Sequence, residues 1–469
     1  MGTRRIHLIN PEAESFTTRP MFMGRALYSP LAGLLAVAAM IPRVRYEVVL
    51  TDENIEPIDF DLKADLVGIS AMTSYAIRGY EIGDIFRNRG IPVIMGGVHP
   101  SFMPSEALAH SDAVVVGEAE LVMPEVLKDL EAGTLKGIYK AEKLHSMVGM
   151  PLPRYDLIKK KRYVNRTFIQ TSRGCHHGCT YCAEQLMNGL KIRHRPVEDV
   201  IREIDQCGER NVSLNDADFF GHPGRAKALM KELRGRGVKW QAGVNSRVAN
   251  NDELLELAVE SGCYMLSIGF ESISRETLKS VHKHVNRPET FQALVKKIHS
   301  HGILVFGLFM FGFDQDDPSV FEETVKFNIE ANYDACAYSV LTPYPGTLLW
   351  YEMLSQKRVV CYDWNKYDQG HIVYKPAKMT PRQLRDGHMM AYNKFYSFPS
   401  IVRRFPVNSS RSKAYWSVYN YFFRKGEVTG RAIENAIADS TEVPQHLPTP
   451  PIMPMKKDTR ELILSANHY

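Results

Sequence analysis

Short apolar runs alternate with amphipathic stretches along the first third of the chain. Runs of strand length, rich in Val, Ile and Leu, lie at 5–10, 45–50, 65–70, 92–95 and 113–116. Helical periodicity fills the gaps at 31–42, 76–89, 104–109 and 120–132. Buried strands joined by helical crossovers form a parallel sheet with helices on both faces. The pattern therefore predicts a Rossmann-like α/β domain over residues 1–140.

A second α/β series begins at residue 167. Its predicted strands lie at 167–171, 211–215, 238–243, 264–269, 304–310 and 335–341, with helices such as 197–207 and 223–236 between them. Six such repeats predict a partial parallel (β/α)6 barrel over 167–350, with its chemistry at the carboxyl ends of the strands. Residues 141–166, which hold Pro151, Pro153 and a short lysine run, are predicted to be a linker.

The last part of the chain changes character twice. Residues 351–430 are helical and rich in aromatic residues, which predicts a small helical cap. Residues 431–469 are polar and rich in proline, which is typical of a disordered tail. The most apolar run, Leu31 to Ile41, has 11 residues, whereas about 20 are needed to span a bilayer. The run is therefore too short for a transmembrane segment, and because it lacks a charged flank it does not resemble a signal peptide.

Composition excludes several classes of protein. The 469 residues are 44% hydrophobic and 24% charged, as in an ordinary globular protein. The net charge of +5 is dispersed along the chain, so nucleic acid is not an expected partner. Seven cysteines in a chain of this length argue against a disulfide framework. Unoxidised cysteines indicate a reducing compartment, and we expect the protein to be cytoplasmic.

Three cysteines form the most informative motif. Cys175, Cys179 and Cys182 have the spacing Cys-x3-Cys-x2-Cys, and three thiolates this close can hold three corners of a cubane iron–sulfur cluster. The fourth iron would stay open to a ligand, which indicates a catalytic site. A zinc site completed by His176 or His177 is the alternative, but zinc sites normally pair two Cys-x2-Cys units and no second one exists. The other cysteines are scattered and fit a hydrophobic interior.

Ligands of doubly wound sheets bind at the carboxyl ends of the strands. In the N-terminal domain these ends carry Thr73, Ser74, Gly96, Gly97, Val98, His99, Gly117 and Glu118. Paired glycines let the backbone approach a ligand closely. The sequence therefore predicts a ligand site at this edge.

The cysteine motif, with Tyr181 inside it and a barrel strand before it, resembles the radical S-adenosylmethionine (SAM) superfamily. The segments 267–272, 302–307, 310–314 and 341–347 resemble later strands of that family's barrel. The segments 96–100 and 116–120 are similar to the cobalamin-binding domain that precedes many radical SAM barrels. This subgroup includes C-methyltransferases and the anaerobic cyclase that closes a porphyrin side ring. The resemblance covers about residues 1–425.

The resemblance implies three cofactors: a [4Fe-4S] cluster on the three cysteines, SAM on the barrel rim, and cobalamin on the N-terminal strand ends. The rim residues implied for SAM are Asp216, Asp218, Asn245, Arg247, Ser267 and Glu271. Each of them could instead be a surface polar residue or a helix cap. Tyr344, between two prolines on the loop after the last barrel strand, either faces substrate or packs in the core.

One family feature is missing. Many cobalamin domains carry Asp-x-His-x-x-Gly, whose His binds cobalt, and residues 1–140 lack this motif. A partial match at 386–391 falls in the helical cap, and we interpret it as chance. We therefore expect cobalamin to bind without a protein imidazole on cobalt. The alternative is a vestigial domain that binds no cobalamin.

The resemblance implies methylation of an unactivated carbon through a 5′-deoxyadenosyl radical. The aromatic cap favours a large, apolar small-molecule substrate, such as a tetrapyrrole, lipid or polycyclic metabolite. An electron donor such as flavodoxin or ferredoxin would reduce the cluster. Oxidation, cyclisation or rearrangement with the same cofactors is the alternative reaction class. A cobalamin or iron–sulfur sensor is a further alternative, against which the SAM-site features of the barrel argue.

Overall fold

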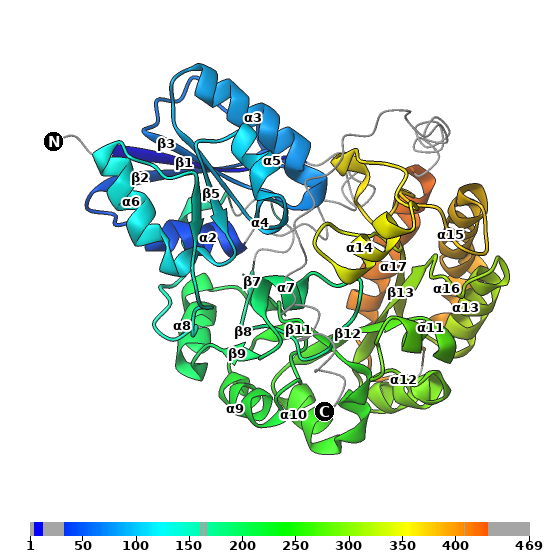
Figure 1. Cartoon of the computed structure of the whole chain (residues 1–469). Helices are drawn as coiled ribbons and strands as arrows, with labels where there is room; N and C mark the ends of the chain where they lie inside the picture. Colours follow the sequence, from blue (N-terminus) through cyan, green and yellow to red (C-terminus); the bar gives the residue numbers. More distant parts are fainter. Residues whose placement is uncertain (1–3, 13–31, 160–162, 164–166, 408, 430–469) are drawn as a thin grey trace.

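Two six-stranded parallel sheets follow one another along the chain (Figure 1). The computed structural model describes residues 4–12, 32–159, 163, 167–407 and 409–429; the side chains of 249–250 and 425–429 are excepted. The predicted tail, 431–469, lies outside the described residues. No helix in the described part of the chain combines the length and apolar character needed to cross a membrane.

The first sheet has the strand order β2-β1-β3-β4-β5-β6. Its strands are β1 (Arg4–Asn10), β2 (Tyr46–Asp52), β3 (Leu66–Ser70), β4 (Val93–Gly96), β5 (Ala113–Val116) and β6 (Ile138–Lys140). Every neighbouring pair is parallel. The first five strands confirm the prediction. The sixth was missed because it is three residues long and buries Tyr139 alone.

Helices cover both faces of this sheet, as predicted. They are α2 (Ala32–Met40), α3 (Ala76–Asn88), α4 (Val98–Phe102), α5 (Pro104–Ala109) and α6 (Met123–Ala132). Helices α2 and α6 share one apolar cluster with the sheet, and α3 and α5 share the other. The strand order reverses between β1 and β3, which makes their carboxyl ends the expected ligand edge.

The second sheet is an open barrel with the order β7-β10-β11-β12-β13-β14. Its strands are β7 (Phe168–Ile169), β10 (Asn211–Leu214), β11 (Lys239–Val244), β12 (Cys263–Glu271), β13 (Leu304–Phe311) and β14 (Ala335–Val340). Its outer helices are α8 (Val197–Cys207), α9 (Pro223–Leu233), α10 (Asp252–Glu260), α11 (Arg275–Ser280), α12 (Phe291–Ser300) and α13 (Ser319–Glu330). These elements confirm the predicted partial barrel, although α9 ends three residues earlier than predicted.

The C-terminal segment is helical, as predicted, but its aromatic residues have another role. It contains α14 (Leu348–Ser355), the 3-10 helix η7 (Trp364–Lys366), α15 (Pro381–Phe395), α16 (Phe398–Arg404) and α17 (Lys413–Thr429). The hydroxyl of Tyr396 bonds to both backbone groups of Cys336 on β14, and the Tyr392 hydroxyl accepts from the backbone N–H of Tyr338. Side chains of α15 thus satisfy the open edge of the barrel, where a strand would otherwise pair.

This packing corrects the interpretation of the aromatic C-terminal segment as a sign of a large, apolar substrate. The Tyr392 and Tyr396 side chains belong to the barrel core rather than to a substrate pocket. The aromatic composition of the segment therefore does not support a large apolar substrate. His388, in the partial motif at 386–391, is buried and its Nε2 lies 2.8 Å from the backbone oxygen of Tyr338. This contact fits the interpretation of that motif as chance.

The stretch predicted as a linker is anchored at both domains. The Tyr155 hydroxyl donates to Glu203 on α8 at 2.7 Å, and the Tyr163 hydroxyl donates to Asp52 on β2 at 2.7 Å. Both tyrosine rings are buried. The stretch therefore fastens the first sheet to the barrel rather than merely connecting them.

Candidate functional site

The cysteine loop lies at the carboxyl edge of the barrel, between two short antiparallel strands, β8 (Ser172–Arg173) and β9 (Arg193–His194). Gly174 opens the loop with φ of +93°, and a Cβ there would lie 2.5 Å from the backbone oxygen of Lys191. A residue with a side chain would not fit, because both the conformation and the close contact require glycine. The helix α7 (Glu184–Asn188) closes the loop.

The three thiols sit in a weakly solvated environment. Burial raises the pKa of Cys175 to about 11 and that of Cys182 to about 12, and it also raises the pKa of Cys179. Neighbouring thiols of the motif add to these shifts, so the three lie close together. A metal must therefore replace a tightly held proton at each sulfur. Three neighbouring, sheltered thiols fit the ligand set of an iron–sulfur cluster.

The arrangement argues against the zinc alternative. Ligands of one zinc ion lie within about 4 Å of one another, since Zn–S bonds measure about 2.3 Å. Among the described residues, three potential metal ligands lie within 4.8 Å of one another in one group alone. That group is His176, His177 and Asp218, and it contains none of the three thiols. The three thiols are spaced more widely than ligands of a single ion. This spacing suits a cluster of several irons.

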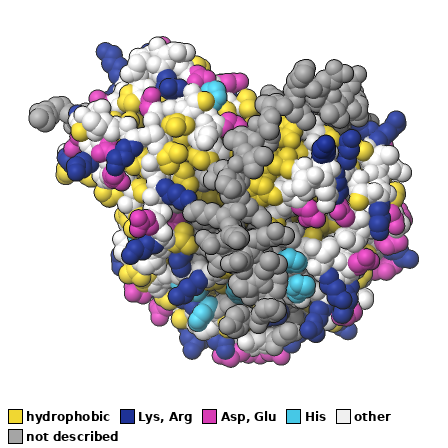
Figure 2. All heavy atoms as spheres, viewed as in Figure 1, with side chains coloured by type: hydrophobic (Ala, Val, Ile, Leu, Met, Phe, Trp, Pro, Cys, Tyr) yellow, Lys and Arg dark blue, Asp and Glu magenta, His cyan; other side chains and the backbone are white. Residues whose placement is uncertain are grey.

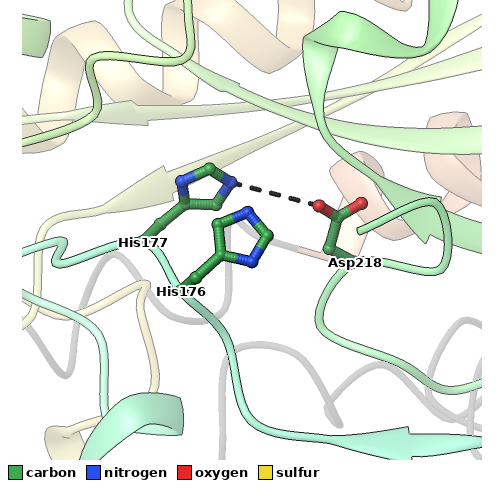
Figure 3. Close-up of side chains that lie close together, drawn as sticks. All are labelled: His176, His177 and Asp218. Carbon is green, nitrogen blue, oxygen red and sulfur yellow. Dashed lines mark ion pairs between the residues drawn. The ribbon is translucent and has the colours of Figure 1, made fainter. Parts of the chain in front are cut away.

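The side chains of His176 and His177, which lie inside the cysteine loop, converge with that of Asp218 (Figure 3). His177 Nε2 lies 4.0 Å from the Asp218 carboxylate, and Asn245 donates to that carboxylate through its side chain at 2.5 Å and its backbone N–H at 3.2 Å. Burial lowers the pKa of His177 to about 3, so this ring is neutral at neutral pH. The structure thus brings together two predicted rim residues, Asp218 and Asn245.

Glu271 has a protein partner. It is the last residue of β12, with φ of +65°, and its Oε1 lies 3.0 Å from Nζ of Lys283. Burial opposes the charge of Lys283, but Glu271 and the thiols of Cys179 and Cys182 raise its pKa above the usual value. The ion pair therefore borders the cysteine loop. Glu271 does not cap the following helix, because Ser274 caps α11 through the backbone N–H of Thr277.

The other predicted rim residues take different positions. Asp216 accepts from Thr171 N at 2.8 Å, from Thr171 Oγ1 at 2.5 Å and from Ser172 N at 2.7 Å. These bonds tie the end of β10 to the corner before the cysteine loop, so Asp216 has a structural position. Ser267 is half-buried on β12 and Arg247 is exposed.

The first sheet holds a cavity of about 530 Å³ on its α2 face. Its lining includes five predicted ligand-edge residues: Gly96, Gly97, Val98, Gly117 and Glu118. Gly68, in the middle of β3, also lines it, and a Cβ there would lie 2.8 Å from Leu8. The barrel contributes Gln170, Arg173, Met187 and Asn188 to the same wall. The cavity therefore reaches the two segments that flank the cysteine loop.

Three predicted ligand-edge residues do not line this cavity: Thr73, Ser74 and His99. The His99 ring is fully buried and lies 5.1 Å from the Trp364 ring, centroid to centroid. Glu106 accepts from Trp364 Nε1 at 2.7 Å beside it. His99 thus belongs to the contact between the first sheet and the C-terminal segment.

Glu118 lines the cavity but is also the centre of a buried ion network between the two sheets. Its carboxylate lies 2.7 Å from Arg193 and 3.1 Å from Arg173, and Glu120 accepts from Arg173 at 2.6 Å. Burial disfavours its charge, but the bond from Arg193 and the charge of Arg173 hold the pKa of Glu118 below its usual value. These arginines sit on β8 and β9, so the network braces the hairpin that carries the cysteine loop.

Tyr344 packs against the core rather than standing free over the rim. Burial raises the pKa of Tyr344 above its usual value. Two residues on, Gly346 has φ of +84°, and a Cβ there would lie 2.7 Å from Phe102 of α4. The loop after β14 thus touches the helix that follows the Gly96–Gly97 turn.

Comparison with known proteins decides the family. The radical SAM superfamily pattern matches residues 169–327, and the B12 binding domain pattern matches 25–127. The bacteriochlorophyllide d C-12(1)-methyltransferase of Chlorobaculum tepidum is 32% identical over 410 residues, which cover 85% of this chain and 88% of that protein. The chain belongs to the cobalamin-binding radical SAM family. It is an enzyme of the radical SAM methyltransferase class.

Two further comparisons agree. The hopanoid C-2 methylase of Rhodopseudomonas palustris is 28% identical over 386 residues, covering 76% of this chain and 71% of that protein. The solved structure of the radical SAM methyltransferase TsrM from Kitasatospora setae shares the fold, with a TM-score of 0.67 and 16% identity. That alignment covers 93% of this chain and 100% of that one.

The family defines the cofactors: a [4Fe-4S] cluster and SAM for the radical SAM domain, and cobalamin for the B12 domain. Both domains of this radical SAM enzyme fit these cofactors. The barrel rim carries three sheltered thiols for the cluster, and the first sheet has a cavity lined partly by glycines for cobalamin. Lys283, Arg173 and Arg193 border this site but were not predicted to do so from the sequence. Only Arg173 carried a local signal, its place directly before the cysteine loop.

Proposed function

We propose that the enzyme methylates a carbon of a large, apolar small molecule, with the cluster on Cys175, Cys179 and Cys182, SAM on the barrel rim and cobalamin in the cavity. The observation that carries this proposal is the shared wall of the cavity. Gln170 and Arg173 precede the cysteine loop, Met187 and Asn188 follow it, and all four line the cavity together with Gly96 and Gly97. Cobalamin held there would lie beside the segments that carry the cysteine loop.

When bound, the cluster and SAM supply a 5′-deoxyadenosyl radical, and cobalamin supplies the transferred methyl group. The protein places these groups and excludes water. The three cysteines hold the cluster. Asp218, oriented by Asn245, offers a carboxylate to the ammonium or the hydroxyl groups of SAM, and the neutral His177 ring beside it adds no competing charge.

Glu271 and Lys283 form the second half of the proposed SAM site. In the ion pair each side chain neutralises the other in a place where a lone charge would be costly. SAM carries an ammonium and a carboxylate, so it can give each side chain a new partner of opposite charge. We assign Ser267, on β12, and Arg247, which follows β11, to the same site because of their positions on the barrel.

The cavity suits the tail of cobalamin. Its wall is mostly aliphatic, and glycines at 68, 96, 97 and 117 leave room along the strand ends. None of the described cavity-lining residues is histidine. We therefore propose that no protein imidazole from this wall binds cobalt.

Two features support an apolar substrate. Leu308 and Met310 alternate along β13 with fully buried residues and are themselves half-buried, which directs them toward the barrel interior. Two relatives carry names that refer to bacteriochlorophyllide d and to hopanoids, both large and apolar. Reduction of the cluster would need a low-potential donor such as flavodoxin or ferredoxin.

Anaerobic reconstitution with iron, sulfide, cobalamin, SAM and a reductant tests this function. Bacteriochlorophyllide d and a hopanoid are the first substrates to offer. Methyl transfer predicts 5′-deoxyadenosine, S-adenosylhomocysteine and a methylated product. Formation of 5′-deoxyadenosine without S-adenosylhomocysteine would assign the enzyme to radical oxidation or cyclisation, and absence of both products would overturn the proposal.

A further inference from the structure

Helix α16 and most of α17 lie in the longest stretch of the chain that has no acidic residue. Between Asp386 and Glu427 there is no acidic residue, and seven Lys or Arg residues occur. On the face shown in Figure 2, by contrast, basic and acidic side chains are interspersed. A long stretch of one sign points to a partner of the opposite sign.

Helices α16 and α17 form an antiparallel pair. Three contacts follow one another along it: Arg424 lies 5.7 Å from the Phe398 ring centroid, Arg404 donates to Asn420 at 3.2 Å, and the Phe405 and Trp416 rings are 5.1 Å apart. The pair buries Arg404, Trp416 and Asn420 against the barrel. Its other faces are turned to solvent.

Those outer faces are apolar to an unusual degree. Of the fourteen large apolar side chains that the described residues expose, six lie within 398–421. They are Phe398 (64% exposed), Val402 (57%), Phe405 (38%), Val407 (63%), Val418 (47%) and Tyr421 (54%). The spacing of 398 and 402, and of 418 and 421, puts each pair on one side of its helix, and Phe405 follows directly after α16. We call these six residues the apolar patch. Patches of this kind mark interaction sites.

Basic side chains flank the apolar patch. Arg403, Lys413 and Arg424 are exposed, and no ion pair is found for them among the described residues. The other described basic residues of the stretch are engaged: Arg404 is buried in bonds to backbone oxygens, Arg411 pairs with Asp334, and Lys394 pairs with Glu322. Three basic side chains for which the described residues offer no ion pair therefore border six exposed apolar side chains, and one of them, Arg424, lies over the Phe398 ring.

We infer that the apolar patch docks on the surface of an anionic lipid bilayer. The interface of such a bilayer accepts aromatic and aliphatic side chains and attracts Lys and Arg. A second copy of the chain would present the same positive charge to itself. Residues 430–469 hold five acidic and four basic residues, so they offer no charge match. The inference goes beyond the proposed function and needs no cofactor.

Sedimentation with lipid vesicles tests the inference on the full chain. We expect binding to vesicles of phosphatidylglycerol, binding to phosphatidylcholine weaker by about tenfold, and partial loss at high salt. The triple variant F398S/V402S/Y421S should bind phosphatidylglycerol vesicles about tenfold more weakly, because three apolar anchors are gone. The matched control V44S/V148S alters two side chains that are 92% and 62% exposed elsewhere, and should bind like the parent.

Charge is tested separately. The variant R403E/K413E should lose the preference for phosphatidylglycerol over phosphatidylcholine while keeping the apolar patch. Three results would overturn the inference. They are no binding of the full chain to phosphatidylglycerol vesicles, equal binding by the triple variant, and a dimer in sedimentation velocity that the triple variant abolishes without any change in vesicle binding. The last would assign the patch to a second copy.

Discussion

The rims of the two parallel sheets present opposite surfaces to a ligand. The first sheet ends in glycines and aliphatic side chains around a cavity of about 530 Å³. The barrel ends in charged and polar side chains that already bind one another, such as Glu271 with Lys283 and Asp218 with Asn245. The first rim can bind a ligand that fills its cavity. The second must exchange internal partners for those of the ligand.

The two rims should therefore respond differently to substitution. A cavity wall tolerates loss of charge but not added volume, because its affinity depends on fit. A rim of paired charges tolerates small changes of shape but not loss of one partner, because the remaining charge stays buried. The Glu118 network lies where the two rims meet and shares both properties. The following experiments separate the two modes.

The largest effect is expected at the cysteines. Cys179→Ala should abolish the cluster and SAM cleavage, since two thiolates cannot hold a cubane. Iron analysis and anaerobic electron paramagnetic resonance measure this. Cys336→Ala, in buried β14, is the control that should keep its iron. Cobalamin binding should persist in both, and equal SAM cleavage by Cys179→Ala would contradict the assignment.

The next effect is expected where the rims meet. Glu118→Gln leaves Arg173 and Arg193 buried without their shared negative partner. The free energy of unfolding should fall by about 3 kcal/mol, at the low end for a broken buried pair because the amide still accepts hydrogen bonds. Chemical denaturation measures this. Hydrogen exchange should also rise across residues 172–194, which hold the cysteine loop.

Glu322→Gln is the control, because its pair with Lys394 is exposed and worth less than about 1 kcal/mol. If Glu118→Gln weakened cobalamin binding alone, with stability and exchange unchanged, Glu118 would be a ligand contact rather than a brace.

At the barrel rim, Glu271→Gln keeps the shape and removes the charge. We expect SAM to bind more weakly by about 1.5–3 kcal/mol, the worth of a hydrogen bond to a charged group. Isothermal titration with SAM measures it, and the iron content should not change. A lower melting temperature with SAM affinity within twofold would instead assign Glu271 a purely structural role.

At the first rim, added volume is the test. Gly96→Val places a branched side chain on the cavity wall, where the nearest protein atom to a new Cβ is 3.7 Å away. Cobalamin should bind about tenfold more weakly, since overpacking costs about 1–3 kcal/mol. Equilibrium dialysis measures it, and the thermal melt should stay close to that of the parent. Unchanged affinity would place cobalamin elsewhere.

The smallest effect is spectroscopic. Because none of the described cavity-lining residues is histidine, any nitrogen superhyperfine splitting of bound cob(II)alamin should come from the base of the cofactor itself, and labelling the protein's histidines with 15N should leave the electron paramagnetic resonance spectrum unchanged. A nitrogen triplet that becomes a doublet on this labelling would contradict the expectation.

Much of the fold was readable from local pattern. The strands of both sheets are short apolar runs, and α8 spans the predicted 197–207 because its apolar spacing is regular. Helix α4 was not predicted, since it has five residues and includes Pro100. The predicted domain boundaries stay a prediction. Tyr155 and Tyr163 tie the predicted linker to both sheets, so these contacts mark no sharp boundary between the domains.

The candidate site was readable only in part. Glycines at strand ends carry a backbone signal, so Gly96, Gly97 and Gly117 could be assigned to the ligand edge without knowledge of contacts. Charged residues carry no such signal, since their role depends on partners far along the chain. Glu118 meets Arg193 across 75 residues, and Asp216 meets Thr171 across 45. The sequence shows these groups but not which of them are already paired.

The side chains of α15 that bind β14 have one more consequence. An unsatisfied edge strand is a template on which other chains can grow, and this barrel ends in such a strand. Tyr392, Tyr396 and His388 occupy its backbone groups, so the edge is closed to other molecules. Detachment of α15 would expose a ready nucleus for aggregation. Attachment of α15 therefore protects this edge from pairing with other chains.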